Sequence, residues 1–556
     1  MEQARLMLAI VISFLIFLVW GYFFEDKTPN NTNIASNQNQ AADKNSGANN
    51  LQSNPLPLES KNTVLDSEAS VNNKKATFRE PKVIKIDSPL YSAELSEKGS
   101  LFKTFSLKNY KETTDEQSPY KNLINNGKGL ATGIIGFESG ALKGLNEAIF
   151  TADAKSDYIE VNDSSRSVTF SFATENGVTI KKRYTFFPDS YLIKLDVNIE
   201  NRSSHPINDS FFISLYGLKP TKKSAYGFVG PSGYINGKLR EVKVKNIPDE
   251  NSFQGKTDWL AFQTTYFMAS IMPENSDVGF MKLFEKEQII ENRYVNQAVI
   301  NPNTVSKFEY NLFIGPKDID VLKSVGHNLE KSVNFGMFDF IVRPCRWLLN
   351  AIYGAIPNYG IAIIILTLIT KIVLWPLGSK SYKSMNKMKK IQPLMTQIRE
   401  KYKHDKQKMN AEVMNLYKTY KINPAGGCLP MILQIPIFFA LYRMLYQMIE
   451  LRHAPFFLWI DDLAAPDRLF RFDFSIPMMS EPYGIPVLTI IMGASMFLQQ
   501  KMSPPPGDPS QAKIMLFLPI IFTVLFVNFS SGLVLYWLIN NLASMGQQYY
   551  ISKKYA

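Results

Sequence analysis

The sequence predicts an α-helical polytopic membrane protein that carries a large all-β domain between its first two membrane spans. Apolar residues make up 45% of the 556-residue chain and gather in a few long runs. A bilayer core requires about 20 apolar residues in a helix, and four of these runs have a suitable length. Residues 76–330 instead show the short alternating pattern of antiparallel strands.

Five apolar runs predict six transmembrane helices, five of which follow the β domain. The runs are Leu6 to Phe24, Tyr359 to Leu377, Cys428 to Ile449, Gly484 to Leu498 and Ile514 to Leu542. The last run is too long for one crossing, and its turn-forming segment Asn528 to Gly532 favours a hairpin of two helices, the first of them short. No small-residue cleavage pattern follows the first run, so an uncleaved anchor is favoured over a signal peptide.

Charged loops predict the orientation, because Lys and Arg are retained on the cytoplasmic side. Lys380 to Lys421 contains twelve basic and three acidic residues, whereas Glu450 to Glu481 contains three basic and six acidic residues. The first loop is therefore cytoplasmic, the second is external, and both termini are cytoplasmic. The net charge of +12 comes mostly from the first loop, so no specific DNA partner is expected.

The external part begins with a segment whose composition predicts disorder. Residues 25–75 are rich in Asn, Ser, Gln and Ala and poor in aromatic residues. In the β domain, the run from Ser167 to Phe187 alternates about Asn176-Gly177, a pair typical of a hairpin turn. No cluster of His, Cys or carboxylate residues marks a metal or catalytic site, and no cofactor is expected.

An interfacial helix is predicted between the β domain and the second span. Phe335 to Ile356 is apolar on one side and carries Arg343 and Arg346 among aromatic residues, as in helices that lie in the headgroup region. Pro344 is expected to start or kink it. The two cysteines, Cys345 outside and Cys428 at the inner end of the third span, are too far apart for a disulfide.

The cytoplasmic loop predicts an antiparallel helical hairpin. Its apolar residues recur at helical spacing in two sets, which are Met385, Met388, Met395, Ile398 and Tyr402, and then Met409, Val413, Leu416 and Tyr420. This stripe is either the seam of the hairpin or a methionine-rich surface for partners. The pattern alone favours neither interpretation.

Lys371 lies inside the second apolar run. A lysine in mid-span costs about 2.5 to 3.5 kcal/mol on insertion scales, so it should face protein or water. The alternative is that its long stem reaches the inner headgroups. Thr367 lies one turn earlier on the same face, and the other spans contribute further polar residues, which are Gln434, Asn528, Asn540 and Asn541. Together these residues predict a wet cavity.

The segments "IQPLMTQIREKY", "KINPAGGCLPMILQIPIFFALYRML", "LRHAPFFLWIDDL" and "FTVLFVNFSSGLVLYWLINN" resemble the bacterial YidC membrane protein insertases, relatives of the mitochondrial Oxa and chloroplast Albino proteins. The resemblance extends to the order of segments in the whole chain. It implies an inner-membrane location, a β-supersandwich in the periplasmic domain and a five-helix insertase core without enzymatic activity.

The resulting segments are an N-terminal anchor (1–24), a disordered linker (25–75), the periplasmic β domain (76–330), the interfacial helix (331–357), transmembrane helix 2 (358–378), the cytoplasmic hairpin (379–423), transmembrane helix 3 (424–450), a periplasmic loop (451–483), transmembrane helix 4 (484–500), a cytoplasmic loop (501–513), transmembrane helices 5 and 6 (514–549) and a short cytoplasmic tail (550–556).

The resemblance also implies a hydrophilic groove, in which the position of Lys371 is usually an arginine. A lysine keeps the charge and loses the planar five-donor group. The expected groove residues are Thr367, Lys371, Gln434, Phe438, Asn528, Tyr536 and Trp537, the last two standing where the family has a tyrosine pair. The basic residues expected to contact the ribosome or another partner are Lys383, Lys387, Lys389, Lys390, Lys401 and Lys403.

The function implied is insertion and chaperoning of nascent membrane proteins, alone or with the Sec translocon. The ribosome, the signal recognition particle system and membrane lipids are the other expected partners. A small-molecule transporter is the alternative, although the chain lacks the internal repeats typical of that class. An intramembrane enzyme is disfavoured because His404 and His453 are expected on opposite sides of the membrane.

Overall fold

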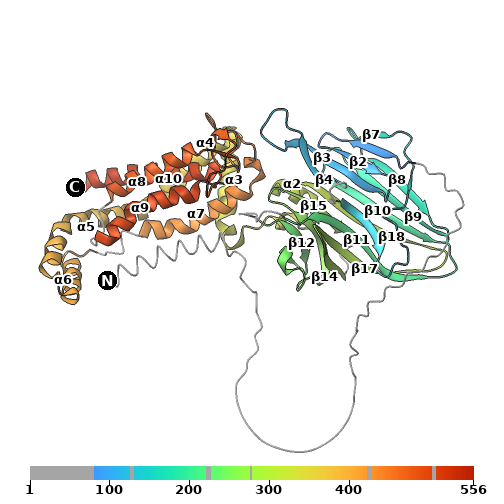
Figure 1. Cartoon of the computed structure of the whole chain (residues 1–556), viewed down its shortest axis with the longest axis horizontal. Coiled ribbons are helices and arrows are strands. Elements are labelled where there is room, and N and C mark those ends of the chain that lie inside the picture. The colour runs from blue at the N-terminus through green and yellow to red at the C-terminus, as the bar shows by residue number, and fades with distance from the viewer. Residues whose placement is uncertain are drawn as a thin grey trace, which may run out of the picture. The chain divides into compact units, whose positions relative to one another are not determined.

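The computed structural model describes residues 80–125, 131–220, 227–275, 278–422, 429–503 and 509–555. The predicted N-terminal anchor, the linker up to residue 75 and Cys428 lie outside the described residues. Figure 1 shows a region of strands followed along the chain by a region of helices. The predicted combination of a mostly β domain with a helical C-terminal region is confirmed.

Most strands are long and antiparallel, and they belong to two sheets of the β domain. The strands of this domain are β1 (Val83–Asp87), β2 (Tyr91–Ser96), β3 (Leu101–Lys111), β4 (Tyr120–Asn125), β5 (Ala131–Phe137), β6 (Thr151–Ala152), β7 (Tyr158–Glu160), β8 (Arg166–Ala173), β9 (Val178–Phe186), β10 (Leu192–Asn201), β11 (Ile207–Leu218), β12 (Gly230–Ile235), β13 (Lys238–Glu241), β14 (Ser252–Gln263), β15 (Phe267–Pro273), β16 (Val278–Lys286), β17 (Ile289–Ile300) and β18 (Thr304–Pro316).

The smaller sheet has the order β4-β3-β2-β1-β7, and the larger sheet follows β5-β11-β17-β16-β14-β15-β18-β10-β9-β8-β6, with β12 and β13 attached at β14. Side chains alternate between core and surface, as on β10, where Ile193, Leu195, Val197 and Ile199 are fully buried. The predicted turn at Asn176-Gly177 joins β8 to β9, which pair antiparallel, and Gly177 has the positive φ of +78° that favours glycine. That hairpin is confirmed.

A buried lysine ties the two sheets of the β domain together. Lys182 on β9 is fully buried and donates hydrogen bonds to the carbonyl oxygens of Gly99, Ser100 and Gly133, at 3.2, 2.8 and 3.0 Å. Gly99 and Ser100 precede β3 in the smaller sheet, and Gly133 lies on β5 in the larger one. Since buried carbonyls require donors, one ammonium group satisfies acceptors from both sheets.

We expect Lys182→Met to lower the free energy of unfolding of the β domain by roughly 2 to 4 kcal/mol, because three buried carbonyls lose a donor. Lys181→Met is the matched control, since that neighbouring side chain is exposed. Hydrogen–deuterium exchange of peptides from β3 and β9 in urea would measure both variants. Equal exchange in the two variants would show that Lys182 does not stabilise the contact between the sheets.

The helical region follows β18. Its helices are α2 (Ile319–Val325), α3 (Asp339–Ala355), α4 (Tyr359–Val373), α5 (Trp375–Lys401), α6 (Lys406–Thr419), α7 (Leu429–Gln447), α8 (Val487–Met502), α9 (Pro509–Phe526) and α10 (Ser531–Lys554), and the short strands β19 (Leu469–Phe472) and β20 (Tyr483–Ile485) form a hairpin before α8. Pro344 lies inside α3, and residues 527–530 separate α9 from α10.

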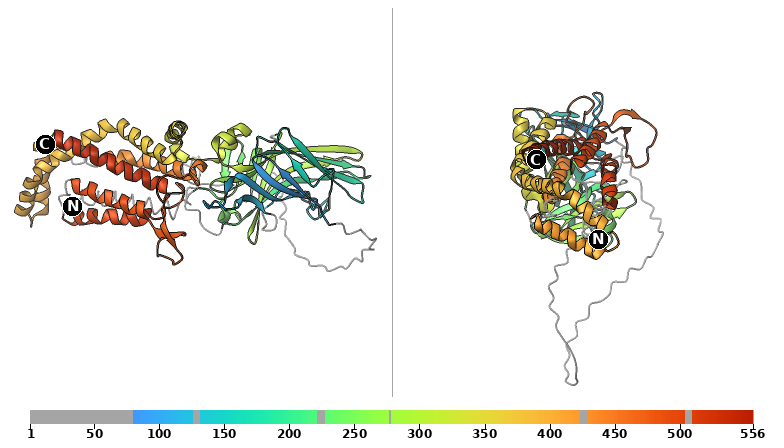
Figure 2. Two further views of the ribbon diagram at one scale, coloured as in Figure 1. Left: turned by 90° about the horizontal axis from the view of Figure 1, so that it is seen from above. Right: turned by 90° about the vertical axis from the view of Figure 1, so that its left-hand side faces the viewer.

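Taken one at a time, none of the helices in the described ranges is long and apolar enough to cross a bilayer alone. The consecutive helices α4 and α5 pass that test as a pair, although they meet at an angle of 66°. Packing centres on α10, which contacts α4, α5, α7 and α8. These helices run alongside one another in Figures 1 and 2.

Helices α5 and α6 pack against each other along part of the apolar stripe noted in the sequence. Ile391 and Met395 on α5 meet Tyr417 on α6 and Ile422 just after it, and Met388, Val413 and Leu416 pack around them. Four of these seven residues, Met388, Met395, Val413 and Leu416, belong to the two predicted sets, so part of the stripe serves as a seam. Met414 and Tyr420, with exposed fractions of 40% and 49%, remain on the surface.

Candidate functional site

A buried polar face on α10 organises the candidate site. Asn540, Asn541, Ser544, Gln547 and Gln548 are each at most 5% exposed, although they lie in an otherwise largely apolar helix. Their spacing of three to four residues places them along one side of the helix. Because buried polar groups require hydrogen-bond partners, this face determines which groups the neighbouring helices present to it.

Lys371 on α4 reaches this face directly. Its Nζ donates a hydrogen bond of 2.7 Å to Oγ of Ser544, which in turn donates one of 2.7 Å to the carbonyl oxygen of Asn540. The lysine side chain is half-buried. An ammonium group has three donors, so the contact with Ser544 leaves two for water or another ligand.

Thr367, one turn before Lys371, is fully buried, and its Oγ1 donates to the carbonyl oxygen of Ile363 at 2.6 Å. Its hydroxyl hydrogen is therefore used within α4. Lys371 therefore has a hydrogen-bond partner on another helix, whereas Thr367 is bonded within its own helix and packs in the interior.

A second group of predicted residues lies between α7, α9 and α10. Gln434 hydrogen-bonds with the Tyr536 hydroxyl, and Phe438, one turn further along α7, meets the Trp537 ring edge to face at 4.7 Å between centroids. Phe526 on α9 approaches Trp537 at 5.2 Å. The buried indole N–H of Trp537 has no hydrogen-bond partner within the described ranges. This group is therefore a buried aromatic cluster, in which Phe438 and Phe526 are 3% and 1% exposed, with one unused donor.

Asn528 lies apart from both groups. It precedes α10, and its Oδ1 accepts hydrogen bonds from Arg468 and from the backbone and hydroxyl of Ser480. The first residue of α10, Ser531, is thirteen residues before Ser544, or about 20 Å along a helix. The structure thus brings Lys371 and Thr367 together on α4 and four residues together around Trp537, but not Asn528.

Asn540 and Asn541 were expected to line the cavity, whereas Ser495, Ser544 and Gln547 belong to the site and were not predicted from the sequence. Asn541 donates to Oγ of Ser495 on α8 at 3.0 Å, and Gln547 donates to the carbonyl oxygen of Trp375 at 3.0 Å. The spacing of Asn540, Ser544 and Gln547 was a usable signal, because three polar residues on one side of an apolar helix indicate a shared interior environment.

The predicted partner-binding lysines lie on α5 and directly after it. Those exposed are Lys387, Lys389, Lys390, Lys401 and Lys403. Lys383 is half-buried, and its Nζ lies 4.1 Å from the centre of the Tyr555 ring. An ammonium group held over an aromatic face is less available for another anion. The exposed lysines therefore form the accessible part of the basic surface.

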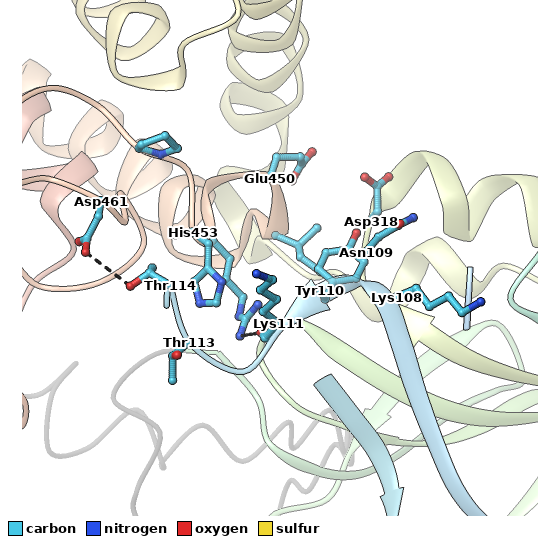
Figure 3. Close-up of a pocket in the computed structure, with 13 residues that line it drawn as sticks. Lys108, Asn109, Tyr110, Lys111, Thr113, Thr114, Asp318, Glu450, His453 and Asp461 are labelled. Carbon is cyan, nitrogen blue, oxygen red and sulfur yellow. Dashed lines mark hydrogen bonds between the residues drawn. The ribbon is translucent and has the colours of Figure 1, made fainter. Parts of the chain in front are cut away.

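A cavity of about 570 Å³ lies where β3 meets the segment after α7 (Figure 3). Arg452 donates from Nη2 to the carbonyl oxygens of Lys111 and Glu112 at 2.6 and 3.0 Å. Burial and the neighbouring Arg452 lower the pKa of His453 to about 4, so its imidazole is neutral at physiological pH. Arg452 is thus hydrogen-bonded within the chain, and His453 is uncharged. We therefore interpret the cavity as part of the structural contact between β3 and the segment after α7, and we refer to this region as the joint.

The same joint contains a three-residue ion-pair network. Arg346 on α3 lies 3.0 Å from both Asp320 on α2 and Glu450 after α7.

Asp461, which also lines the cavity, accepts a hydrogen bond from Thr114, as Figure 3 also shows. The described residues contain no group of three or more side chains suited to holding a metal ion.

We expect Phe438 and Trp537 to be energetically coupled. In a double-mutant cycle with Phe438→Leu and Trp537→Leu, loss of the edge-to-face contact should give a coupling energy of about 0.5 to 1.5 kcal/mol. Reversible unfolding in mixed micelles would measure it. A cycle of Phe438→Leu with Leu542→Ala is the control, because Leu542 is 47% exposed. Coupling near zero in both cycles would contradict the aromatic contact.

Comparison with known proteins gives matches over almost the whole chain. The family model described as "60Kd inner membrane protein" matches residues 351–556, and that described as "YidC periplasmic domain" matches residues 83–348. The membrane protein insertase YidC of Syntrophus aciditrophicus is 38% identical over 99% of both chains. That of Syntrophobacter fumaroxidans is 40% identical over 84% of this chain and 86% of its own length.

Among solved structures, an active YidC insertase whose first transmembrane domain is resolved is 21% identical, with a TM-score of 0.38. The match covers 85% of this chain and 93% of that structure.

Proposed function

We propose a groove mechanism for this chain on the premise that it belongs to the family of YidC membrane protein insertases. The chain is accordingly a membrane protein insertase and not an enzyme, and it contains a periplasmic domain. In this proposal the groove would open beside the polar face of α10, and its charged residue would be Lys371. The hydrogen bond between Lys371 and Ser544 carries this proposal.

The physical task is to lower the cost of moving polar groups through hydrocarbon. Each unsatisfied backbone group or charge costs several kcal/mol in a lipid core. The polar face of α10 and the free donors of Lys371 would replace part of the lost hydration over the inner half of the path. This effect requires no bond chemistry.

A nascent membrane protein has two parts with different requirements. Its polar external tail would enter the groove, and an acidic tail would be attracted by Lys371. Its apolar helix would leave between α7 and α9, where Phe438, Phe526 and Trp537 are in contact and would have to separate. The buried indole N–H of Trp537 would then become accessible as a donor.

We include in the same proposal the fold of the β domain, the position of α3 in the membrane and the number of spans. The β domain would be a periplasmic β-supersandwich, α3 would lie in the outer interface, and six spans including the N-terminal anchor would leave both termini in the cytoplasm. The lysine-rich surface of α5 supports a ribosome contact. The signal recognition particle system and the Sec translocon would deliver or share clients, and the groove would open to membrane lipids.

A charge-dependent groove gives a specific expectation for Lys371. Lys371→Arg should retain insertion, whereas Lys371→Ala should slow clients with acidic external tails several-fold and affect clients with neutral tails less, because only the former lose an attraction. Protease protection of radiolabelled clients in inverted vesicles would measure insertion. Lys380→Ala is the control, since this lysine is exposed near the start of α5.

Normal insertion of every acidic client by Lys371→Ala would contradict the groove charge. Photocrosslinking from position 371 to a stalled nascent membrane protein tests the function itself. A small-molecule transporter, the alternative class, would give no such crosslinks.

Ribosome binding should be weak and sensitive to salt. Each phosphate contact lowers log K by roughly 0.7 to 0.9 for every tenfold increase in salt. Neutralising Lys387, Lys389 and Lys390 together should therefore weaken co-sedimentation with translating ribosomes and reduce its salt dependence. Adding Lys383 should have a smaller further effect because this lysine is held over Tyr555.

The control for this experiment is removal of Lys553 and Lys554 at the end of α10. We expect it to change binding little. Binding that is lost with these two lysines and unaffected by the substitutions on α5 would place the ribosome contact at the C-terminus instead.

A further inference from the structure

The hairpin of β19 and β20 carries an unusual set of exposed apolar side chains. Phe470, Phe474 and Met478 are 72%, 65% and 75% exposed, and we refer to these three residues as the apolar tip. The hairpin projects from the helical region in Figure 2. Large apolar residues gathered on one exposed element indicate an interaction surface.

The base of the hairpin is fixed by one buried arginine. Arg468, only 6% exposed, donates to the carbonyl oxygens of Pro482 at 2.7 Å and Val527 at 2.8 Å, and to Oδ1 of Asn528 at 3.3 Å. Asn528 donates in turn to the carbonyl oxygen of Met478 at 2.8 Å. Both arms of the hairpin are thus attached to the connection between α9 and α10.

The neighbouring Asp467 fixes the hairpin to α8. Its Oδ2 accepts hydrogen bonds from the backbone N–H groups of Leu488 and Thr489, in the first turn of that helix, and its Oδ1 accepts one of 2.5 Å from Nε1 of Trp459. The hairpin is therefore positioned relative to the outer ends of α8, α9 and α10. The apolar tip has a defined depth with respect to these helices.

The exposed apolar surface continues from the hairpin along the adjacent helices. Ile485 at the end of β20 is 41% exposed, and Ile491 and Leu498, which are seven residues apart on the same side of α8, are 45% and 55% exposed. On α9, Phe517 and Ile520 are each 58% exposed. In a membrane protein such surfaces on the helices face lipid, and the hairpin of the apolar tip leads directly into one of these helices, since β20 ends two residues before α8 begins.

Charge favours apolar insertion over attraction to anionic headgroups. The hairpin contains one basic residue, Arg471, and two acidic residues, Asp473 and Glu481, and Arg471 lies 3.6 Å from Asp461. Anionic lipids attract clusters of basic residues, and the hairpin has no such cluster.

We propose that the apolar tip inserts into the outer leaflet, at the boundary between headgroups and acyl chains. Aromatic side chains are enriched at this depth because their rings suit an interface. The tip would hold the outer ends of α8, α9 and α10 at a fixed level in the bilayer. This proposal rests on the proposed function, because it requires that the helices cross a membrane.

Depth-dependent quenching by brominated lipids tests the tip. In the full chain with Cys345→Ser and Cys428→Ala, Phe474→Cys would carry an environment-sensitive fluorophore in liposomes of zwitterionic lipid. We expect about twofold or greater quenching relative to a labelled Val278→Cys on the β domain, and stronger quenching by bromines near the headgroups than by bromines deep in the acyl chains. Met478→Cys provides a second probe if Phe474→Cys disturbs the hairpin.

A labelled Ile520→Cys on α9 separates this proposal from the proposed function. Quenching at position 520 but not at 474 or 478 would overturn insertion of the tip and leave the membrane-spanning helices intact. Absence of quenching at all three positions would overturn the crossing itself. Disulfide formation between tips of two copies, in place of quenching, would assign the surface to self-association and also overturn the lipid contact.

Discussion

The need to partner buried polar groups on α10 is the constraint on which the helical region depends. Ser544 accepts from Lys371 on α4, Asn541 donates to Ser495 on α8, and Gln547 donates to the carbonyl oxygen of Trp375 at the start of α5. Each bond joins α10 to a different helix. In apolar surroundings an unpartnered group of this kind would be costly, so the three bonds restrict how these helices rotate about α10.

This arrangement also depends on where α10 begins, which the loop before α8 determines. The backbone N–H groups of Ser531 and Gly532 donate to the carbonyl oxygens of Ala465 and Leu463, at 2.8 and 2.9 Å. The first N–H groups of a helix have no partner within it, so the loop satisfies groups that would otherwise be exposed at this end. Because Arg468 bonds the same connection, and its neighbour Asp467 bonds the first turn of α8, the loop, the start of α10 and the start of α8 form one unit.

Local patterns in the sequence predicted much of this structure, whereas contacts between distant residues were not predictable. The turn at Gly177 follows from a residue pair with a strong backbone preference, and the contact of Lys371 with another helix follows from the cost of a charge in an apolar run. Asn528 was grouped with the cavity residues because it is polar and lies between apolar helices. Its partner, Arg468, is sixty residues earlier, and no periodicity connects the two. Ser544 was overlooked because a single serine in a helix carries little information until the residue opposite it is known.

A lysine at position 371 would determine the selectivity of the proposed groove. An arginine would present a planar set of donors suited to two parallel hydrogen bonds with a carboxylate. Lys371 instead has a compact charge, one of whose donors is used by Ser544, and the nearby hydroxyl of Thr367 is already bonded within α4. The two donors that remain belong to one compact ammonium group, so no planar pair of donors is available to orient a carboxylate. Selection at this point would therefore depend on the sign and number of charges in the client and little on their geometry.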